Sequence, residues 1–270
     1  MPELPEVETT LRGIKPWICG HSIQQVRVHN RHLRWPVPDS LVTDITGQSL
    51  LELHRRGKYL LFKFPTGTML VHLGMSGSLR MTKATAPLHK HDHLQWTFDN
   101  GRCLRLEDPR RFGCVLFTTE PAQHRLLKSL GPEPFSTTFS GIWLYQQAAK
   151  RRIAVKTLIM DHRVVTGVGN IYACEALFTA GIDPRRRCNR ISKQRYQRLA
   201  TAIRDTLGQA IEAGGTTLRD FHQVDGRPGY FTRLLQVYGR NQQTCLRCHR
   251  PIRQVVISQR SSFYCPGCQK

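Results

Sequence analysis

Several features of membrane and secreted proteins are missing from this sequence. It has no run of about 18 apolar residues, so no membrane-spanning helix is expected. The first residues, MPELPEVETT, are acidic and are not followed by an apolar stretch, which argues against a secretory signal peptide. We therefore expect a cytoplasmic protein with no membrane attachment.

Acidic residues are also scarce. The 270 residues include 19 Asp and Glu against 40 Lys and Arg, which gives a formal net charge of +21. This charge favours a polyanionic partner. No acidic residue follows Asp225, and the cations beyond it are spread over turns and strand-like segments. Because they do not form one amphipathic helix, nucleic acid is favoured over a membrane surface. We expect a nucleoid-associated monomer.

Residues 22–118 have the pattern of short β-strands. Seven strand-like runs are separated by turn residues: SIQQVRV, LLELH, KYLLFKF, TMLVHL, LQWTF, RCLRL and CVLFT. The stretches at 65–68 and 98–102 have the Pro, Gly and Asn content of tight hairpin turns. Many short strands at this spacing are typical of a β-sandwich or barrel. We expect helices at 5–16 and about 121–130 to flank it.

The second half of the chain has a helical pattern. It begins after a stretch rich in Pro, Gly, Ser and Thr at 131–141, which indicates a domain boundary. The apolar spacing then predicts helices over 146–161, 170–181 and 192–214. Ser192 is expected to cap the third of these helices.

Four of the nine cysteines form the pattern C-x2-C-x16-C-x2-C at Cys245, Cys248, Cys265 and Cys268. Two such pairs supply four thiolates in a tetrahedron, the preferred site of structural zinc. Disulfides are disfavoured in a reducing compartment, and a redox pair would not need the second CxxC. We expect one structural Zn²⁺. Arg260 lies near the turn of a hairpin between the pairs, as a solvated arginine or as a phosphate contact.

The glycine-rich stretch TGVGN at 166–170 precedes a predicted helix. Backbone N–H groups at such a helix start can bind a phosphate, although Asn170 alone is also a common helix cap. Basic residues on the preceding predicted helix favour the phosphate interpretation; they are Lys150, Arg151, Arg152 and Lys156.

Two predicted turns carry residues that suit insertion into DNA. The turn at 74–77 contains Met75, and the turn at 108–113 contains Arg110 and Phe112. Met and Phe act as wedges in proteins that kink DNA, and arginine can read a base. A single Met or Phe more commonly packs in a core, so the interpretation of these residues as a wedge depends on the presence of two such turns in one basic chain.

The first residues could supply an amine nucleophile. If Met1 is removed, Pro2 becomes a secondary α-amine, and a much larger fraction of it is unprotonated at neutral pH than of a lysine. Such an amine can attack a sugar C1′ and form an iminium, with Glu3 beside it as a proton donor. The alternative is that Pro2 only protects the chain from aminopeptidases and that Glu3 is solvated.

The chain closely resembles, nearly end to end, the bacterial formamidopyrimidine-DNA glycosylases, also called 8-oxoguanine-DNA glycosylases. The motifs that carry the resemblance are MPELPEVETT, RRGKYLL, HLGMSGSLR, KHDH, DPRRFG, GVGNIYACEALF, GGTTLRDF, DGRPGYF, QVYGR and the four-cysteine tail with QRSSFYC. The resemblance implies an α+β multidomain fold. Its parts are an N-terminal catalytic β-sandwich with flanking helices (1–131), a linker with a helix–two-turn–helix domain (132–235) and a zinc finger (236–270).

The resemblance also implies an activity in base excision repair. Oxidised purines, namely 8-oxoguanine and formamidopyrimidines, would be removed from double-stranded DNA and the abasic strand cut by β- and δ-elimination. Pro2 resembles the Schiff-base nucleophile and Glu3 the proton donor that helps open the deoxyribose. Lys58 resembles the lysine of β-elimination, or is a charge at a strand edge. Arg260 resembles the zinc-finger arginine of δ-elimination and phosphate binding.

The remaining implied positions contact DNA. His91, Arg151 and Asn170 match DNA-binding positions. Met75, Arg110 and Phe112 match the three residues that fill the gap left by an everted lesion, with Arg110 facing the opposite cytosine. Within the expected long loop at 214–231, Arg219 and Arg227 stand where relatives often have lysine, and the two residue types are not equivalent in a fitted pocket.

Two other functions compete with this one. An endonuclease VIII-like glycosylase for oxidised pyrimidines typically begins PEGPE, whereas this chain has PELPE after Met1. A non-catalytic DNA-binding zinc protein of the same fold would form no covalent intermediate with DNA.

Overall fold

The computed structural model describes residues 2–216 and 231–270, and Met1, Arg219 and Arg227 lie outside this part of the chain. The chain divides into two compact units, one of Met1–Lys128 with Ala213–Thr232 and the other of Ser129–Glu212 with Arg233–Lys270. The finer division at 131 and 235 stays a prediction. Among the described residues, no helix has the length and apolar character to span a membrane.

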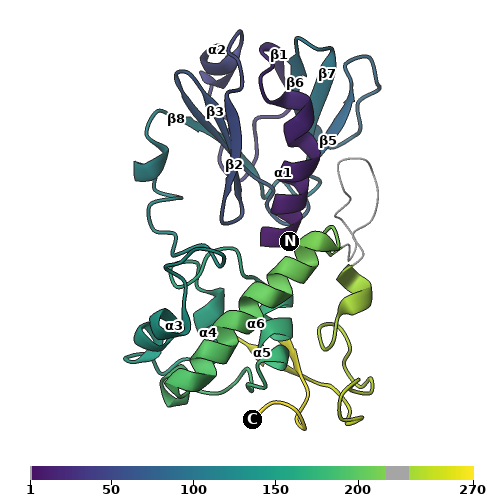
Figure 1. Ribbon diagram of the computed structural model, residues 1–270. Helices are drawn as coiled ribbons and strands as arrows, with labels where there is room; N and C mark the ends of the chain where they lie inside the picture. Colours follow the sequence, from purple (N-terminus) through teal and green to yellow (C-terminus); the bar gives the residue numbers. More distant parts are fainter. Residues whose placement is uncertain (1, 217–230) are drawn as a thin grey trace. The chain divides into compact units, whose positions relative to one another are not determined.

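The first unit contains two antiparallel sheets of four strands, which can be followed in Figure 1. The first sheet has the order β1 (Ile23–Val28), β6 (Asp92–Phe98), β7 (Arg102–Glu107), β5 (Ser78–Lys83). The second has the order β2 (Glu52–Arg56), β3 (Tyr59–Phe64), β4 (Gly67–His72), β8 (Cys114–Thr118). The predicted sandwich and both predicted hairpin turns are confirmed. Strand β5 was not predicted, because only Leu79 of its side chains is fully buried and the alternation is weak.

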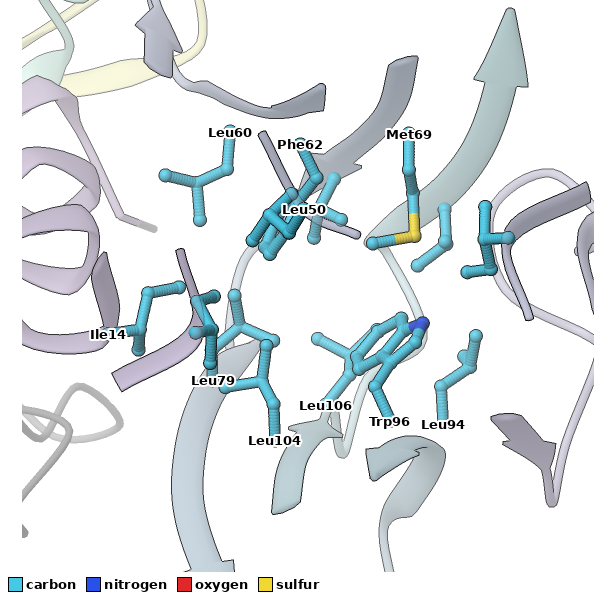
Figure 2. Packing of buried hydrophobic residues seen from close by; sticks show 14 of the residues in the cluster. Ile14, Leu50, Leu60, Phe62, Met69, Leu79, Leu94, Trp96, Leu104 and Leu106 are labelled. Atoms are coloured by element: carbon cyan, nitrogen blue, oxygen red, sulfur yellow. The ribbon is translucent and has the colours of Figure 1, made fainter. Parts of the chain in front are cut away.

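The core lies between the two sheets. Alternate residues of each strand face inward, as the period of two requires. Figure 2 shows Phe62 of one sheet facing Trp96 and Leu104 of the other, and all three are at most 1 % exposed.

Helix α1 (Leu4–Ile18) closes one side of this core. Its predicted apolar face of Val7, Leu11 and Ile14 is buried in the same hydrophobic cluster. A short helix, α2 (Leu41–Ile45), adds two further buried side chains.

The predicted helix at about 121–130 is wrong. The chain there forms one 3₁₀ turn, η1 (Pro121–Gln123), followed by turns. Leu127 is the one hydrophobic residue of 121–130 in the buried core. A segment with no apolar face to bury gains no tertiary stabilisation, so its helix propensity alone does not maintain a helix.

In the second unit, the predicted helix over 146–161 is also wrong, because the segment is divided. It forms the end of α3 (Gly141–Ala148) and then α4 (Val155–Met160). Between them, Cys188 N–H donates to Ile153 C=O and Val155 N–H donates to Arg186 C=O. These β-type bonds to a distant segment take the backbone groups that a continuous helix would need.

The other predicted elements of this unit are confirmed. Helix α5 (Asn170–Thr179) is followed by η2 (Cys188–Arg190) and α6 (Lys193–Glu212). Ser192 precedes α6, and its hydroxyl accepts from Arg195 N–H at 3.4 Å. A 3₁₀ turn, η3 (Phe231–Leu234), then leads to the antiparallel hairpin of β9 (Arg253–Ile257) and β10 (Arg260–Tyr264).

Candidate active site

Three turns of the first unit lie at the same end of the β2-β3-β4-β8 sheet. Tyr59 pairs with His72 across β3 and β4, and His72 pairs with Cys114 across β4 and β8. The turns that adjoin these three residues therefore come together. These turns carry Lys58 before β3, Met75 after β4, and Arg110 and Phe112 before β8.

The start of α1 is attached to the same end. Glu8 accepts a hydrogen bond from Arg55 Nε at 2.8 Å, and Arg55 Nη1 donates to Gly57 C=O at 3.0 Å in the turn with Lys58. Burial alone would raise the pKa of Glu8, but the bond and charge of Arg55, with those of Arg12, hold it below its usual value. Arg55 thus connects Glu8, in the N-terminal half of α1, to the turn that contains Lys58.

Pro2 and Glu3 are both buried at this start of α1, and Glu3 is 2 % exposed. Glu6 fixes the backbone of this short arm. One oxygen of its carboxylate accepts from Glu3 N–H at 2.8 Å, and the other accepts from Thr216 N–H at 2.8 Å. Glu6 therefore joins the N-terminal arm to Thr216, the last described residue before 217–230. The position of Glu6 at the start of a predicted helix does not indicate its bond with Thr216.

The two predicted wedge turns differ in the burial of their side chains. Phe112 is 46 % exposed, so it does not pack in the core, and Met75 is partly buried. The guanidinium of exposed Arg110 lies 4.9 Å from the centre of the Phe112 ring, within the range of a cation–π contact. His91 lies just before β6, with its ring 6.4 Å from that of His93.

His72 lies beneath these turns. Its ring centre is 4.7 Å from that of Tyr59, and its Nδ1 accepts from Gly74 N–H at 3.0 Å. Burial, with smaller contributions from the positive charges of Lys58 and Arg34, lowers the pKa of His72 to about 4. His72 is therefore neutral at physiological pH and acts as an acceptor at the start of the Met75 turn.

In the second unit, Asn170 and Lys156 hold the β9–β10 hairpin. The buried Lys156 ammonium donates to Asn170 Oδ1 and to Ser262 Oγ, the latter at 2.6 Å. Asn170 Nδ2 donates to Ser261 C=O at 3.0 Å. Asn170 is the first residue of α5 and the helix cap is Gly169, so the capping interpretation of Asn170 does not hold.

Arg260 is exposed at the start of β10, next to the turn, where the sequence placed it. It borders a groove of about 310 Å³ whose lining includes Lys156, Thr157 and Asp161. Arg151 is paired with Asp161 at 3.1 Å, and both side chains are partly exposed. The exposed and half-exposed cations of this surface suit a polyanion.

The four predicted zinc ligands converge. Their sulfur atoms all lie within 4.8 Å of one another, with Sγ distances of 3.3 Å for Cys248–Cys265 and 3.9 Å for Cys245–Cys268. A tetrahedron with Zn–S bonds of about 2.3 Å requires Sγ distances of about 3.8 Å. The four residues therefore fit one zinc ion, and because they complete its coordination the site is structural.

Sequence reasoning missed a buried acidic residue on α5. Glu175 is 3 % exposed and accepts from the N–H groups of Gln236, Val237 and Tyr238 at 2.8–3.0 Å. Burial raises the pKa of Glu175 although these donors act in the opposite direction. A single acidic residue within the apolar run IYACEALF is the signal that could have identified it.

Three family models cover most of the chain. They are the formamidopyrimidine-DNA glycosylase N-terminal domain at residues 1–115, the H2TH domain of the same glycosylase at 130–222, and the zinc finger found in FPG and IleRS at 242–270. They correspond to the sandwich, to a segment that includes α3–α6, and to the four-cysteine hairpin.

Curated relatives match over their full length. The formamidopyrimidine-DNA glycosylases of Nitrosococcus oceani and Methylococcus capsulatus are 54 % and 55 % identical to this chain, with 100 % of each chain covered.

Solved structures of the same kind match the fold. The MutM (Fpg) protein of Thermus thermophilus is 37 % identical with a TM-score of 0.89, over 99 % of this chain and 98 % of that one. A mutant Lactococcus lactis Fpg in complex with Fapy-dG DNA is 31 % identical with a TM-score of 0.93, and both chains are covered completely. The chain belongs to the formamidopyrimidine-DNA glycosylase family.

Proposed function

We propose that this protein removes oxidised purines, namely 8-oxoguanine and formamidopyrimidines, from double-stranded DNA and then cuts the abasic strand as a lyase. The observation that carries the proposal is the placement of Pro2 and Glu3. They lie in a fixed, buried arm at the end of the sandwich that also carries Lys58 and both wedge turns. Removal of Met1 would add an amine to the carboxyl group of Glu3 in this arm, at the end of the sandwich where the turn with Lys58 lies.

The chemistry begins after Met1 has been removed, because the Pro2 nitrogen is otherwise an amide. The free amine attacks C1′ of the everted nucleotide, so that an N–C1′ bond forms and the bond to the damaged base breaks. The Glu3 carboxyl gives a proton to the ring oxygen as the deoxyribose opens to an iminium. Eversion itself costs a few kcal/mol of stacking, and a damaged base reduces this cost.

Strand cutting follows from the iminium. It acidifies C2′, and loss of that proton expels the 3′ phosphate by β-elimination, for which Lys58 is the proposed base. A second elimination expels the 5′ phosphate, with Arg260 bound to the DNA backbone. Water then adds to C1′ of the remaining iminium, the N–C1′ bond breaks, and Pro2 returns as a free amine.

The other proposed contacts hold the DNA in place. His91, Arg151 and Asn170 contact the backbone, and Met75 and Phe112 fill the gap left by the everted base. Arg110 reads the cytosine opposite the lesion, since arginine suits hydrogen bonding to base edges. The zinc ion keeps the hairpin with Arg260 folded. We further propose that the protein acts as a cytoplasmic monomer on nucleoid DNA.

Relatives support this substrate and also define the alternative. Lactococcus lactis Fpg has been solved with Fapy-dG DNA and with abasic-site DNA, and in another case with DNA that contains an oxidised pyrimidine. The third complex favours an oxidised pyrimidine as a second candidate substrate.

Borohydride trapping on matched duplexes tests the proposal. The duplexes would be identical except for 8-oxoguanine, a formamidopyrimidine, an oxidised pyrimidine or guanine opposite cytosine. We expect covalent complexes and cut strands with the two purine lesions and neither with guanine, and Glu3→Gln should bind but not excise. Trapping with the pyrimidine lesion alone would support an endonuclease VIII-like function, and binding without any trapping would indicate a non-catalytic protein.

A further inference from the structure

We infer that Asp108 is a positioning residue that joins the two wedge turns, so that Met75, Arg110 and Phe112 move as one rigid unit. The inference rests on the proposed function, because it concerns how the protein everts a base. It adds a residue that touches neither the DNA nor the reacting atoms.

The carboxylate of Asp108 bridges the two turns directly. One oxygen accepts from Ser76 Oγ at 3.0 Å, in the turn with Met75. The other accepts from Gly113 N–H at 2.7 Å, at the end of the turn with Phe112. Ser76 Oγ in turn accepts from Arg110 N–H at 3.3 Å, which closes a ring of hydrogen bonds between the turns.

The backbone of Asp108 extends this connection to the segment with His91. Asp108 N–H donates to His91 C=O at 3.1 Å. Asp108 C=O accepts from His93 Nε2 at 2.8 Å and from Arg111 N–H at 3.1 Å. Asp108 therefore connects three segments: the one with His91, the turn with Met75 and the turn with Phe112. Apart from the N-terminal arm and Lys58, these segments carry the proposed DNA contacts of the first unit.

The two turns also touch backbone to backbone. Gly74 has φ +64°, and a Cβ at this position would lie 2.3 Å from the carbonyl carbon of Phe112. A Cβ at Gly113 would lie 2.7 Å from His72 C=O and 3.0 Å from the Asp108 carboxylate. No side chain fits in either place, so only glycine allows this close approach, and the bonds of Asp108 join the two turns where their backbones meet.

The residues that connect the two wedge turns are buried, whereas two of the residues proposed to contact DNA are exposed. Asp108 is fully buried and Ser76 is 6 % exposed, whereas Arg110 and Phe112 are exposed. A buried carboxylate that satisfies donors from two turns rigidifies them, because loss of either partner leaves an unpaired polar group without water. Because Asp108 already orders the backbone of both turns, their exposed side chains can insert into DNA without a further loss of conformational entropy in the turns. Asp108 should therefore affect eversion and reading of the opposite base, and not the steps at C1′.

The test compares Asp108→Asn and Ser76→Ala with the wild-type protein. Asp99→Asn is the matched control, since Asp99 also accepts a backbone N–H and a side-chain donor, from Ser22 and His21, but lies exposed at the β6–β7 hairpin. Three rates are measured under single-turnover conditions and corrected for the borohydride-trappable fraction. They are excision of 8-oxoguanine opposite cytosine, excision opposite adenine, and cutting at a preformed abasic site. Fluorescence of 2-aminopurine beside the lesion follows eversion.

We expect Asp108→Asn to slow excision opposite cytosine by about tenfold or more, as expected for a lost partner of a buried hydrogen bond. Cutting at the abasic site should change far less, because no base has to be unstacked there. The preference for cytosine over adenine should narrow, the 2-aminopurine signal should rise more slowly, and Asp99→Asn should match the wild type.

Equal losses on all three substrates after the correction would overturn the inference, as would unchanged eversion in both variants. Should Asp108→Asn fail to fold, Ser76→Ala makes the same test with the loss of one hydroxyl. A wild-type protein that excises neither purine lesion would instead refute the proposed function.

Discussion

The acid stability of the sandwich should depend on His72. Burial and the charges of Lys58 and Arg34 lower the pKa of His72 to about 4 in the folded protein, against 6.5 for an ordinary histidine. Between these values the unfolded chain binds a proton that the folded protein does not, so the free energy of unfolding rises with pH across this window. Protonation would also put a hydrogen on the Nδ1 atom that accepts from Gly74 N–H.

The magnitude follows from the two pKa values. Between pH 7.5 and pH 4.5, a histidine with these values loses about 2.5 kcal/mol of stability by proton linkage. Other groups and the zinc site also respond to pH, but they are common to the wild type and to His72→Gln. The difference between the two proteins isolates His72, and the Gln amide oxygen can still accept from Gly74 N–H.

Urea unfolding at a series of pH values measures this difference, at fixed ionic strength and zinc concentration. Tryptophan fluorescence reports mainly on the first unit, which contains Trp17, Trp35 and Trp96. We expect the free energy of unfolding of the wild type to fall more steeply between pH 7 and 4.5 than that of His72→Gln. Parallel curves for the two proteins would refute a lowered pKa for His72.

Three further predictions concern the second unit. Cys248→Ser, or removal of zinc by a chelator, should abolish DNA binding, because the hairpin with Arg260 would unfold; normal binding by either sample would contradict this. Asn170→Ala should weaken binding to damaged and undamaged duplexes by a similar factor, since phosphate contacts carry no base information, and wild-type affinity should fall steeply with salt in titrations. A lesion-selective loss would show that Asn170 acts elsewhere. Glu175→Gln should destabilise this unit by about 1–3 kcal/mol in thermal or urea unfolding, because its amide NH2 cannot accept from a backbone N–H and leaves a buried donor unpaired; an unchanged midpoint would mean that the three backbone donors contribute little.

The elements predicted correctly from the sequence are those fixed by local pattern. The sandwich strands other than β5 follow from the strand-like pattern of the sequence, and α6 follows from the apolar spacing that starts at Tyr196, which is fully buried. The zinc site follows from the spacing of its cysteines alone, because the ligands of each pair are neighbours in the chain.

The errors arise where distant segments decide the local structure. The break before α4 depends on hydrogen bonds from 153–155 to 186–188, and no pattern within 146–161 signals them. Lys156 resembles a surface cation in the sequence, but it is buried under the hairpin that contains Ser262.

The candidate site shows the same contrast. The Met75 turn and the turn with Phe112 could be predicted from their Gly and Pro content. Their connection could not, because the bond between Ser76 and Asp108 spans 32 positions. Nor does the sequence reveal that Glu6, at an ordinary helix start, also binds Thr216.

The identity of the nucleophile can be decided by mapping the covalent cross-link to DNA. Protein with a processed N-terminus, and a homogeneous preparation that retains Met1, would each be trapped with borohydride on a duplex with 8-oxoguanine opposite cytosine. Mass spectrometry of the digested product should place the cross-link on Pro2 in the processed protein. The Met1-bearing protein should bind the duplex through its basic surfaces but form no cross-link. A cross-link on Lys58, or full strand cutting by the Met1-bearing protein, would contradict the proposed mechanism.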